Sequence, residues 1–406
     1  MALRLGGDRM LDRLTYGMEL TLRSSALALL LGLRWVGLRN GAGRAGIPAP
    51  RWDLRLLSKV ALDELFFATE LVSAPFLSRR DGVRVGKEVS EALELYEARG
   101  WLDDPAGYHV CPPSLERIRL ENFRSLCGGY RHLQYESEYE PQPGEPGRER
   151  WLGYTANRTA HARLVVHPGR PRPWLVCVPG YRMGHAAVDF TGFPARWLHQ
   201  DLGLNVAIPV IPLHGPRRVG RRGGDGFFTG DFVDTVHAQA QAVWDIRRLI
   251  SWLHAQGAPA VALYGVSLGG YTAALLASLE ENLDCVIAGI PASDFLRLMQ
   301  AHAPPFVLRA AARIGLSFEN IERLLRVVSP LALMPLVPRE RRFLYAGLAD
   351  RLASPDHARD LWDHWERPHI TWYHGSHISF LWQAEVKALL RRALSTSGLV
   401  SPDPTE

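Results

Sequence analysis

Apolar residues recur along this chain with two different spacings, and the change falls about a third of the way from the start. In the first part they return every three or four residues, as one face of a helix requires. The clearest case has apolar residues at Leu54, Leu57, Ala61, Leu65, Ala68 and Val72. Helices are expected over residues 1–40, 54–72, 85–101 and 113–127. Together they predict an N-terminal helical extension over residues 1–130, whose function cannot be read from the pattern.

Further along, short apolar runs alternate with helical patterns. A polar and apolar alternation over residues 133–139 is typical of a strand. Compact apolar runs follow at residues 160–166, 174–178, 204–210, 261–264, 285–290, 343–346 and 370–373. Helices between such runs indicate a mostly parallel sheet with helices on both faces. The sequence therefore predicts an α/β domain over residues 131–396 and a flexible tail over residues 397–406.

One junction between a strand and a helix carries a serine among small residues, in the run Gly265-Val266-Ser267-Leu268-Gly269-Gly270. Glycines let the incoming strand and the outgoing helix pass close together, so that the serine stands clear of the backbone. The start of the helix directs free N–H groups and the positive end of its dipole toward the same point. Ser267 is therefore the candidate nucleophile, and Leu268 N–H is a candidate oxyanion donor; a simple tight turn is the alternative.

At these residues the sequence resembles the α/β-hydrolase superfamily of serine hydrolases, over about residues 160–395. The resemblance implies the α/β-hydrolase fold. It also implies a second oxyanion donor in the loop after residues 174–178, where Tyr181 N–H takes that position. Many members have His-Gly in this loop, whereas this chain has Pro179-Gly180, so Tyr181 is assigned by position and an ordinary turn is the alternative.

The resemblance further implies a triad acid at the end of a later strand. Asp350 ends a Gly-x-x-Asp turn after residues 343–346 and resembles that acid. A carboxylate there can orient a histidine and stabilise its protonated form. Asp294, which follows the preceding apolar run, is the alternative, because some members of the superfamily use that position.

The base implied by the resemblance is His377, which follows the small residues Gly375-Ser376 after the last strand. His374 is the weaker alternative. The order Ser267, Asp350, His377 along the chain is that of the superfamily. A zinc site at the two histidines is not expected, since neither the His-Glu-x-x-His pattern nor a cysteine partner is present.

Two connections depart from simple alternation. Residues 295–341 carry apolar helical segments, and members of the superfamily place a lid there; an extended helical connection is the alternative. The loop over residues 212–228 is rich in arginine, and Arg217 and Arg218 are its candidate contacts for an acidic substrate. A solvated basic surface is the alternative.

Composition narrows the classes of partner. The 406 residues carry a net charge of +5, with 47 basic and 42 acidic residues interspersed. Because no nucleic-acid-binding motif accompanies this charge, no nucleic-acid partner is expected. Cys177 and Cys285 lie in apolar runs, as buried thiols do, and Cys111 and Cys127 are too few for a disulfide framework. These features favour the cytoplasm.

The first apolar stretch, residues 26–33, begins late for a secretory signal and is too short to span a bilayer. Arginines flank it on both sides. Residues 24–39 therefore predict either a helix packed on the protein or a peripheral contact with a membrane surface.

Together these residues predict a serine hydrolase that cleaves an ester or related acyl bond in a small-molecule substrate through an acyl-enzyme. The resemblance implies no metal or organic cofactor. Two alternatives stay open. One is a serine peptidase of the oligopeptidase type, and the other is a non-catalytic interaction protein that binds through the N-terminal helices. The oligomeric state cannot be read from the sequence.

Overall fold

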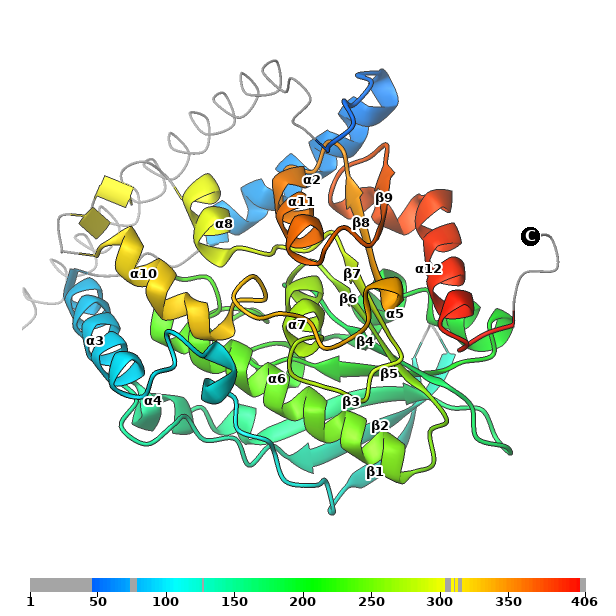
Figure 1. Ribbon diagram of the computed structural model, residues 1–406, viewed down its shortest axis with the longest axis horizontal. Helices are drawn as coiled ribbons and strands as arrows, with labels where there is room; N and C mark the ends of the chain where they lie inside the picture. Colours follow the sequence, from blue (N-terminus) through cyan, green and yellow to red (C-terminus); the bar gives the residue numbers. More distant parts are fainter. Residues whose placement is uncertain are drawn as a thin grey trace, which may run out of the picture.

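A computed structural model describes residues 46–73, 79–125, 128–303, 308–309, 311–312 and 316–401. Through them runs one nine-stranded sheet with the order β1-β2-β3-β5-β4-β6-β7-β8-β9 (Figure 1). The strands are β1 (Arg119–Ser125), β2 (Gly128–Glu136), β3 (Thr159–Val165), β4 (Trp174–Val178), β5 (Asn205–Val210), β6 (Val261–Val266), β7 (Cys285–Gly289), β8 (Arg342–Gly347) and β9 (His369–Tyr373). The pairs β1–β2, β2–β3 and β3–β5 are antiparallel, and all other pairs are parallel.

Helices cover both faces of this sheet. Within the described ranges the α-helices are α2 (Leu54–Ser73), α3 (Arg79–Ala98), α4 (Arg148–Leu152), α5 (Ala186–Gly192), α6 (Phe232–Ala255), α7 (Leu268–Leu276), α8 (Phe295–His302), α10 (Phe318–Leu325), α11 (Pro355–His364) and α12 (Ala384–Thr396). One apolar core joins the sheet to α3, α6, α7 and α10, and a second joins its other face to α12. The predicted α/β fold with a mostly parallel sheet is confirmed.

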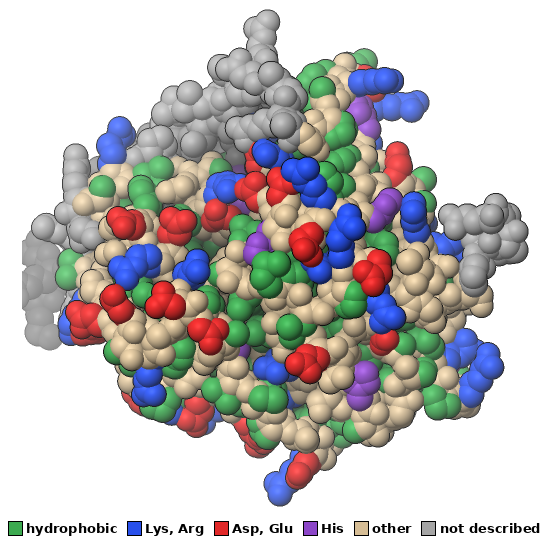
Figure 2. Space-filling model, viewed as in Figure 1, with side chains coloured by type: hydrophobic (Ala, Val, Ile, Leu, Met, Phe, Trp, Pro, Cys, Tyr) green, Lys and Arg blue, Asp and Glu red, His purple; other side chains and the backbone are tan. Residues whose placement is uncertain are grey.

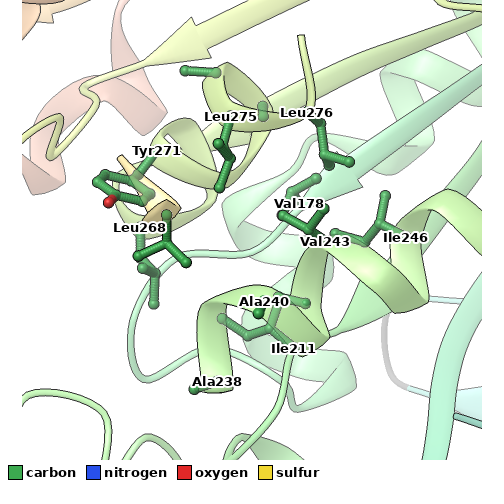
Figure 3. Packing of buried hydrophobic residues seen from close by; sticks show 14 of the residues in the cluster. Val178, Ile211, Ala238, Ala240, Val243, Ile246, Leu268, Tyr271, Leu275 and Leu276 are labelled. Carbon is green, nitrogen blue, oxygen red and sulfur yellow. The ribbon is translucent and has the colours of Figure 1, made fainter. Parts of the chain in front are cut away.

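The central strands show why their sequence is apolar throughout. Val176 and Val178 of β4 belong to the core on the side of α6 and α7, whereas Leu175 and Cys177 belong to the core on the side of α12. A strand that is covered on both faces needs apolar side chains at every position. Figure 3 shows side chains of α6 and α7 gathered around Val178, at the end of β4 that leads toward the candidate site.

The first strand corrects the expectation for the N-terminal third. Residues 119–125 form β1, with Phe123 opposite Tyr130 of β2, so the helix expected over residues 113–127 is wrong. The apolar spacing there fits a helix, but pairing with β2 satisfies the backbone, and tertiary context overrides such local preference. The sheet therefore begins inside the segment 1–130 that was assigned to a helical extension.

The helices expected over residues 54–72 and 85–101 correspond to α2 and α3. Both pack on the body of the protein: α3 lies against α6 and α10, and Arg84 of α3 forms an ion pair with Asp231 at 2.7 Å. The expected helix over residues 1–40 and the expected membrane contact over residues 24–39 lie outside the described residues.

At the other end of the chain, the expectation of a flexible tail from residue 397 is wrong at Leu399. Leu399 is buried in the core beside α12, and its amide bonds to Leu394 O at 2.8 Å. On the face drawn in Figure 2, acidic and basic side chains intermingle around small apolar patches. None of the described helices is long and apolar enough to cross a membrane.

Candidate active site

Ser267 lies at the turn between β6 and α7, in a backbone conformation that is unusual for a serine. Its φ is 57° and its ψ is −116°, and such strain costs on the order of 1–3 kcal/mol. Two glycines permit the turn. A Cβ at Gly269 would lie 1.9 Å from Val178 O, and a Cβ at Gly265 would lie 1.9 Å from Gly269 O. The half-buried serine is thus held by close backbone contacts that no larger residue allows.

The loop after β4 lies directly beside this turn. A Cβ at Gly180 would lie 3.1 Å from Val266 O and 3.4 Å from the Cβ of Ser267. Tyr181 follows Gly180 in this loop, and Leu268 follows Ser267 with its side chain in the core (Figure 3). No acceptor among the described residues takes either amide. Leu268 N–H is thus adjacent to Ser267, and Tyr181 N–H lies in the loop that contacts the serine turn.

His377 and Asp350 form a close pair. His377 Nδ1 lies 2.7 Å from Asp350 Oδ2, and Asp350 Oδ1 accepts the amides of Leu352 and Ala353 at 2.9 and 2.8 Å. Burial alone would lower the pKa of His377, but the charge and hydrogen bond of Asp350, together with the charge of Asp63, outweigh burial and raise it. The pair favours the tautomer with the proton on Nδ1, which leaves Nε2 free to accept a proton.

The alternatives to these residues have other partners. The carboxylate of Asp294 accepts the amide of Arg297 at 2.9 Å and caps α8. The ring of His374 accepts the amide of Arg51 at 3.1 Å. Of the two acids and two histidines considered, Asp350 and His377 are therefore the pair that the structure brings together.

Ser267, Asp350 and His377 follow β6, β8 and β9, which are parallel members of one sheet. All three thus lie at the same edge, where α/β sheets bind their ligands. Within the described part of the chain, the Ser267 hydroxyl has no hydrogen bond to the His377 ring. Such bonds are often long without a substrate and shorten when one binds.

The sequence did not reveal a buried carboxylate on α2. Asp63 is fully buried, and its oxygens accept the amides of His377, Ile378 and Arg351 at 2.8, 3.0 and 3.1 Å. Burial, reinforced by the nearby charge of Asp350, raises the pKa of Asp63 to about 6. The carboxylate thus joins the backbone of the histidine loop to that of the acid turn.

The face of α2 expected to be apolar is largely exposed: Leu54 is 85% exposed and Leu65 is 63% exposed. The buried face instead carries Leu56, Val60, Asp63 and Phe67, at helical spacing. The signal in the sequence that could have revealed Asp63 was a carboxylate within an apolar stripe, because acidic residues are almost never fully buried without partners.

The predicted role of Arg217 in binding substrate is wrong. Arg217 is fully buried, where it donates to Val210 O and Asn157 O at 3.0 and 2.9 Å and forms an ion pair with Asp245 at 2.8 Å. Its guanidinium is therefore part of the core. Arg218 is exposed, and its contact with a substrate stays a prediction.

Residues 295–341 contain the helices α8 and α10, as expected. Phe295 of α8 stacks on Tyr271 with ring centroids 3.7 Å apart, and Phe228 lies between the rings of Phe295 and Tyr181 at 5.2 and 5.3 Å. Phe228 is half-buried, whereas Phe295 and Tyr271 are buried, so Phe228 is the ring that lies partly exposed beside Tyr181. A lid role for residues 295–341 stays a prediction.

No protein-family model matches the chain. Two proteins of Mycobacterium tuberculosis, Uncharacterized protein MT2702 of strain CDC 1551 / Oshkosh and Uncharacterized protein Rv2627c of strain ATCC 25618 / H37Rv, are each 41% identical over 362 residues. These matches cover 89% of this chain and 87% of each relative.

Among solved structures, acetyl xylan esterase 1 from Thermoanaerobacterium sp. JW/SL YS485 matches with a TM-score of 0.52 and 15% identity, over 75% of this chain and 93% of that one. The acetyl xylan esterase from Paenibacillus sp. R4 matches with a TM-score of 0.50 and 16% identity, over 75% of this chain and 94% of that one. At such low identity the likeness concerns the fold.

Proposed function

The chain belongs to one family with the two mycobacterial proteins and shares its fold with the acetyl xylan esterases, and from this premise we propose that it is a serine hydrolase of the α/β-hydrolase superfamily that cleaves an ester or related acyl bond. The observation that carries the proposal is the 2.7 Å pair of His377 and Asp350, at the same sheet edge as the strained turn of Ser267. A protein that uses this fold only for binding has no need of these three groups together.

In the proposed mechanism the Ser267 hydroxyl attacks the acyl carbon while His377 Nε2 takes its proton. Asp350 stabilises the imidazolium that forms. The N–H groups of Leu268 and Tyr181 donate to the oxyanion of the tetrahedral intermediate. His377 then returns the proton to the leaving group. Water next attacks the acyl carbon while His377 takes its proton, and that proton passes to Ser267 Oγ as the bond to the acyl group breaks and the acid leaves.

The surroundings support an acyl substrate. The half-buried rings of Tyr181 and Phe228 offer an apolar wall beside the loop of one proposed oxyanion donor, backed by the buried ring of Phe295. Such a wall favours the hydrocarbon part of an acyl group over a charged group. We therefore propose a small-molecule ester or thioester, with the acyl part directed toward this wall.

The test uses a fluorophosphonate probe and a series of p-nitrophenyl esters on the full chain. Ser267→Ala should lose labelling and reduce kcat by about a million-fold, as removal of such a nucleophile has done elsewhere. Ser251→Ala, an exposed serine on α6, is the matched control and should keep both. Turnover in Ser267→Ala, or a wild type that neither labels nor hydrolyses any ester, would overturn the proposal.

A further inference from the structure

Helix α2 contacts three loops that border the proposed catalytic site. It passes close to the ends of β8 and β9 (Figure 1). Its buried residues Leu56 and Val60 pack with Ala349, the residue before Asp350. From this position its polar side chains reach the histidine loop, the acid turn and the loop after β4.

The contact with the histidine loop is the most extensive. Asp63 accepts the amides of His377 and Ile378, so His377 is held by its backbone on α2 and by its ring on Asp350. Lys59 Nζ donates to His374 O at 2.8 Å, and the Ser376 hydroxyl donates to Lys59 O at 2.8 Å. Four hydrogen bonds thus join α2 to residues 374–378.

The other two loops are joined to α2 by ion pairs. Glu64 of α2 lies 3.2 Å from Arg351, the residue after Asp350, and the amide of Arg351 donates to Asp63. Glu70 lies 2.6 Å from Arg182, the residue after Tyr181. Arg182 has a φ of 68°, so this side chain contact secures a loop whose backbone is itself strained.

We propose that α2 is a positioning element for the catalytic site and that Asp63 is the positioning residue for His377. The inference rests on the proposed hydrolase function, since it concerns how that site reaches high turnover. A displacement of about 1 Å at a catalytic group can reduce the rate about a hundredfold, so the amide contacts of Asp63 bear directly on kcat.

The chemistry of the contact explains why the residue is an acid. Three amides need three acceptor positions in a fixed direction, and a carboxylate supplies them from two oxygens. Within the described residues no lysine or arginine side chain forms an ion pair with Asp63. The charges that act on Asp63 are those of Asp350 and His377. The carboxylates of Asp63 and Asp350 in turn both act on His377. Asp63 therefore adds negative charge beside the imidazolium of the mechanism.

Asp63→Asn in the full chain tests the proposal, with kcat and KM measured from pH 5 to pH 9. The asparagine side chain has one oxygen in place of two, so it can accept the backbone amides on only one side of the group. We expect kcat to fall about 10- to 100-fold and KM to change less than about 3-fold, since the binding surface is intact. The acid limb of kcat/KM should also move to lower pH, because the variant lacks a charge that favours protonated His377.

Glu145→Gln is the matched control. Glu145 is also buried and also accepts three neutral donors: Tyr96 Oη at 2.7 Å, Tyr108 Oη at 3.0 Å and the amide of Gln142 at 2.6 Å. Its partners lie outside the catalytic loops, so it should lose stability without moving the pH profile. Equal kcat and equal pH profiles for the two variants would overturn the role of Asp63.

Lys59→Met provides a second route if Asp63→Asn fails to fold. It keeps the aliphatic stem and removes only the ammonium that binds His374 O. We expect kcat to fall about 3- to 10-fold with the melting temperature nearly unchanged, as for a loosened catalytic loop. An unchanged kcat would overturn the proposal. A wild type without Ser267-dependent turnover would instead disprove the proposed hydrolase function. The failure of that function and the failure of the positioning role of α2 are therefore distinguishable.

Discussion

The turn of Ser267 and the loop of His377 are fixed in opposite ways. At the serine, the constraint is made by the backbone: the neighbouring Gly269 allows contact with β4, and the Ser267 amide bonds to Gly289 O of the adjacent strand at 2.9 Å. At the histidine, the constraint comes from far along the chain, because the His377 amide bonds to Asp63, 314 residues earlier. The serine turn depends on neighbouring glycines that have no side chain. The histidine loop depends on the side chain of Asp63, which comes from another region of the chain.

This difference predicts how each half fails. A constraint made of backbone contact tolerates no added atom, so a substitution there should prevent folding. A constraint made of side-chain hydrogen bonds can be weakened while the fold persists, so a substitution there should reduce turnover. The largest effects should therefore come from the glycines of the turn.

Gly269→Ala should break the serine half. The added methyl would lie 1.9 Å from Val178 O and 2.6 Å from Val178 C, and both atoms belong to the central strand β4. We expect a loss above about 5 kcal/mol in the free energy of unfolding and little soluble protein. Urea unfolding and soluble yield measure it. Gly257→Ala is the control: its φ is +80° with open space around it, so it should cost only about 1 kcal/mol.

Asp350→Asn should break the histidine half without unfolding the protein. The amide would favour the wrong tautomer of His377, and kcat should fall by about ten thousandfold, equivalent to about 5 kcal/mol in the barrier. Asp294→Asn should reduce kcat less than about tenfold, because Asp294 caps α8 and an asparagine caps nearly as well. Steady-state hydrolysis of one ester by both variants decides; the reverse ranking would give the acid role to Asp294.

The same contrast explains what the sequence could reveal. The central strands and the turn of Ser267 were predictable because their requirements lie in adjacent residues: apolar runs covered on both faces and glycines beside a serine. The strand β1 was mistaken for a helix because its pairing with β2 is a tertiary contact. Asp63 was missed and Arg217 misassigned for the same reason, since the burial of each depends on segments distant in sequence.

Arg217→Met tests a second contact between segments distant in sequence, the ion pair with Asp245, which lies outside the catalytic loops. Removal of the guanidinium leaves Asp245 buried without its ion pair, so we expect a loss of about 3–5 kcal/mol in the free energy of unfolding. Arg218→Met, at an exposed position, should change it by less than about 0.5 kcal/mol. Urea unfolding of both variants measures this. A normal unfolding midpoint for Arg217→Met, with a raised KM for anionic esters alone, would show that Arg217 binds the substrate after all.

The smallest expected effect concerns the stability cost of placing Asp63 where the histidine needs it. Burial, and then the charge of Asp350, raise the pKa of Asp63 from 3.8 to about 6, so the folded protein holds that proton more tightly than the unfolded chain does. Stability from this group is therefore fully present below about pH 4 and is lost as the pH rises through about 6.

The free energy of unfolding of the wild type minus that of Asp63→Asn should accordingly fall by about 2 kcal/mol between pH 4 and pH 6, on a constant offset from the lost hydrogen bonds. Buried histidines such as His214 and His357, whose pKa values burial lowers to about 4, give the opposite slope in both proteins and cancel in the difference. Urea unfolding at pH 4, 5, 6 and 7 measures it. Asp189→Asn should behave alike, because burial raises the pKa of Asp189 to about 6 despite Arg163. A flat difference for Asp63 would mean that its charge is solvated, and the remote half of the site would then be fixed by the shape of α2 and not by a buried carboxylate.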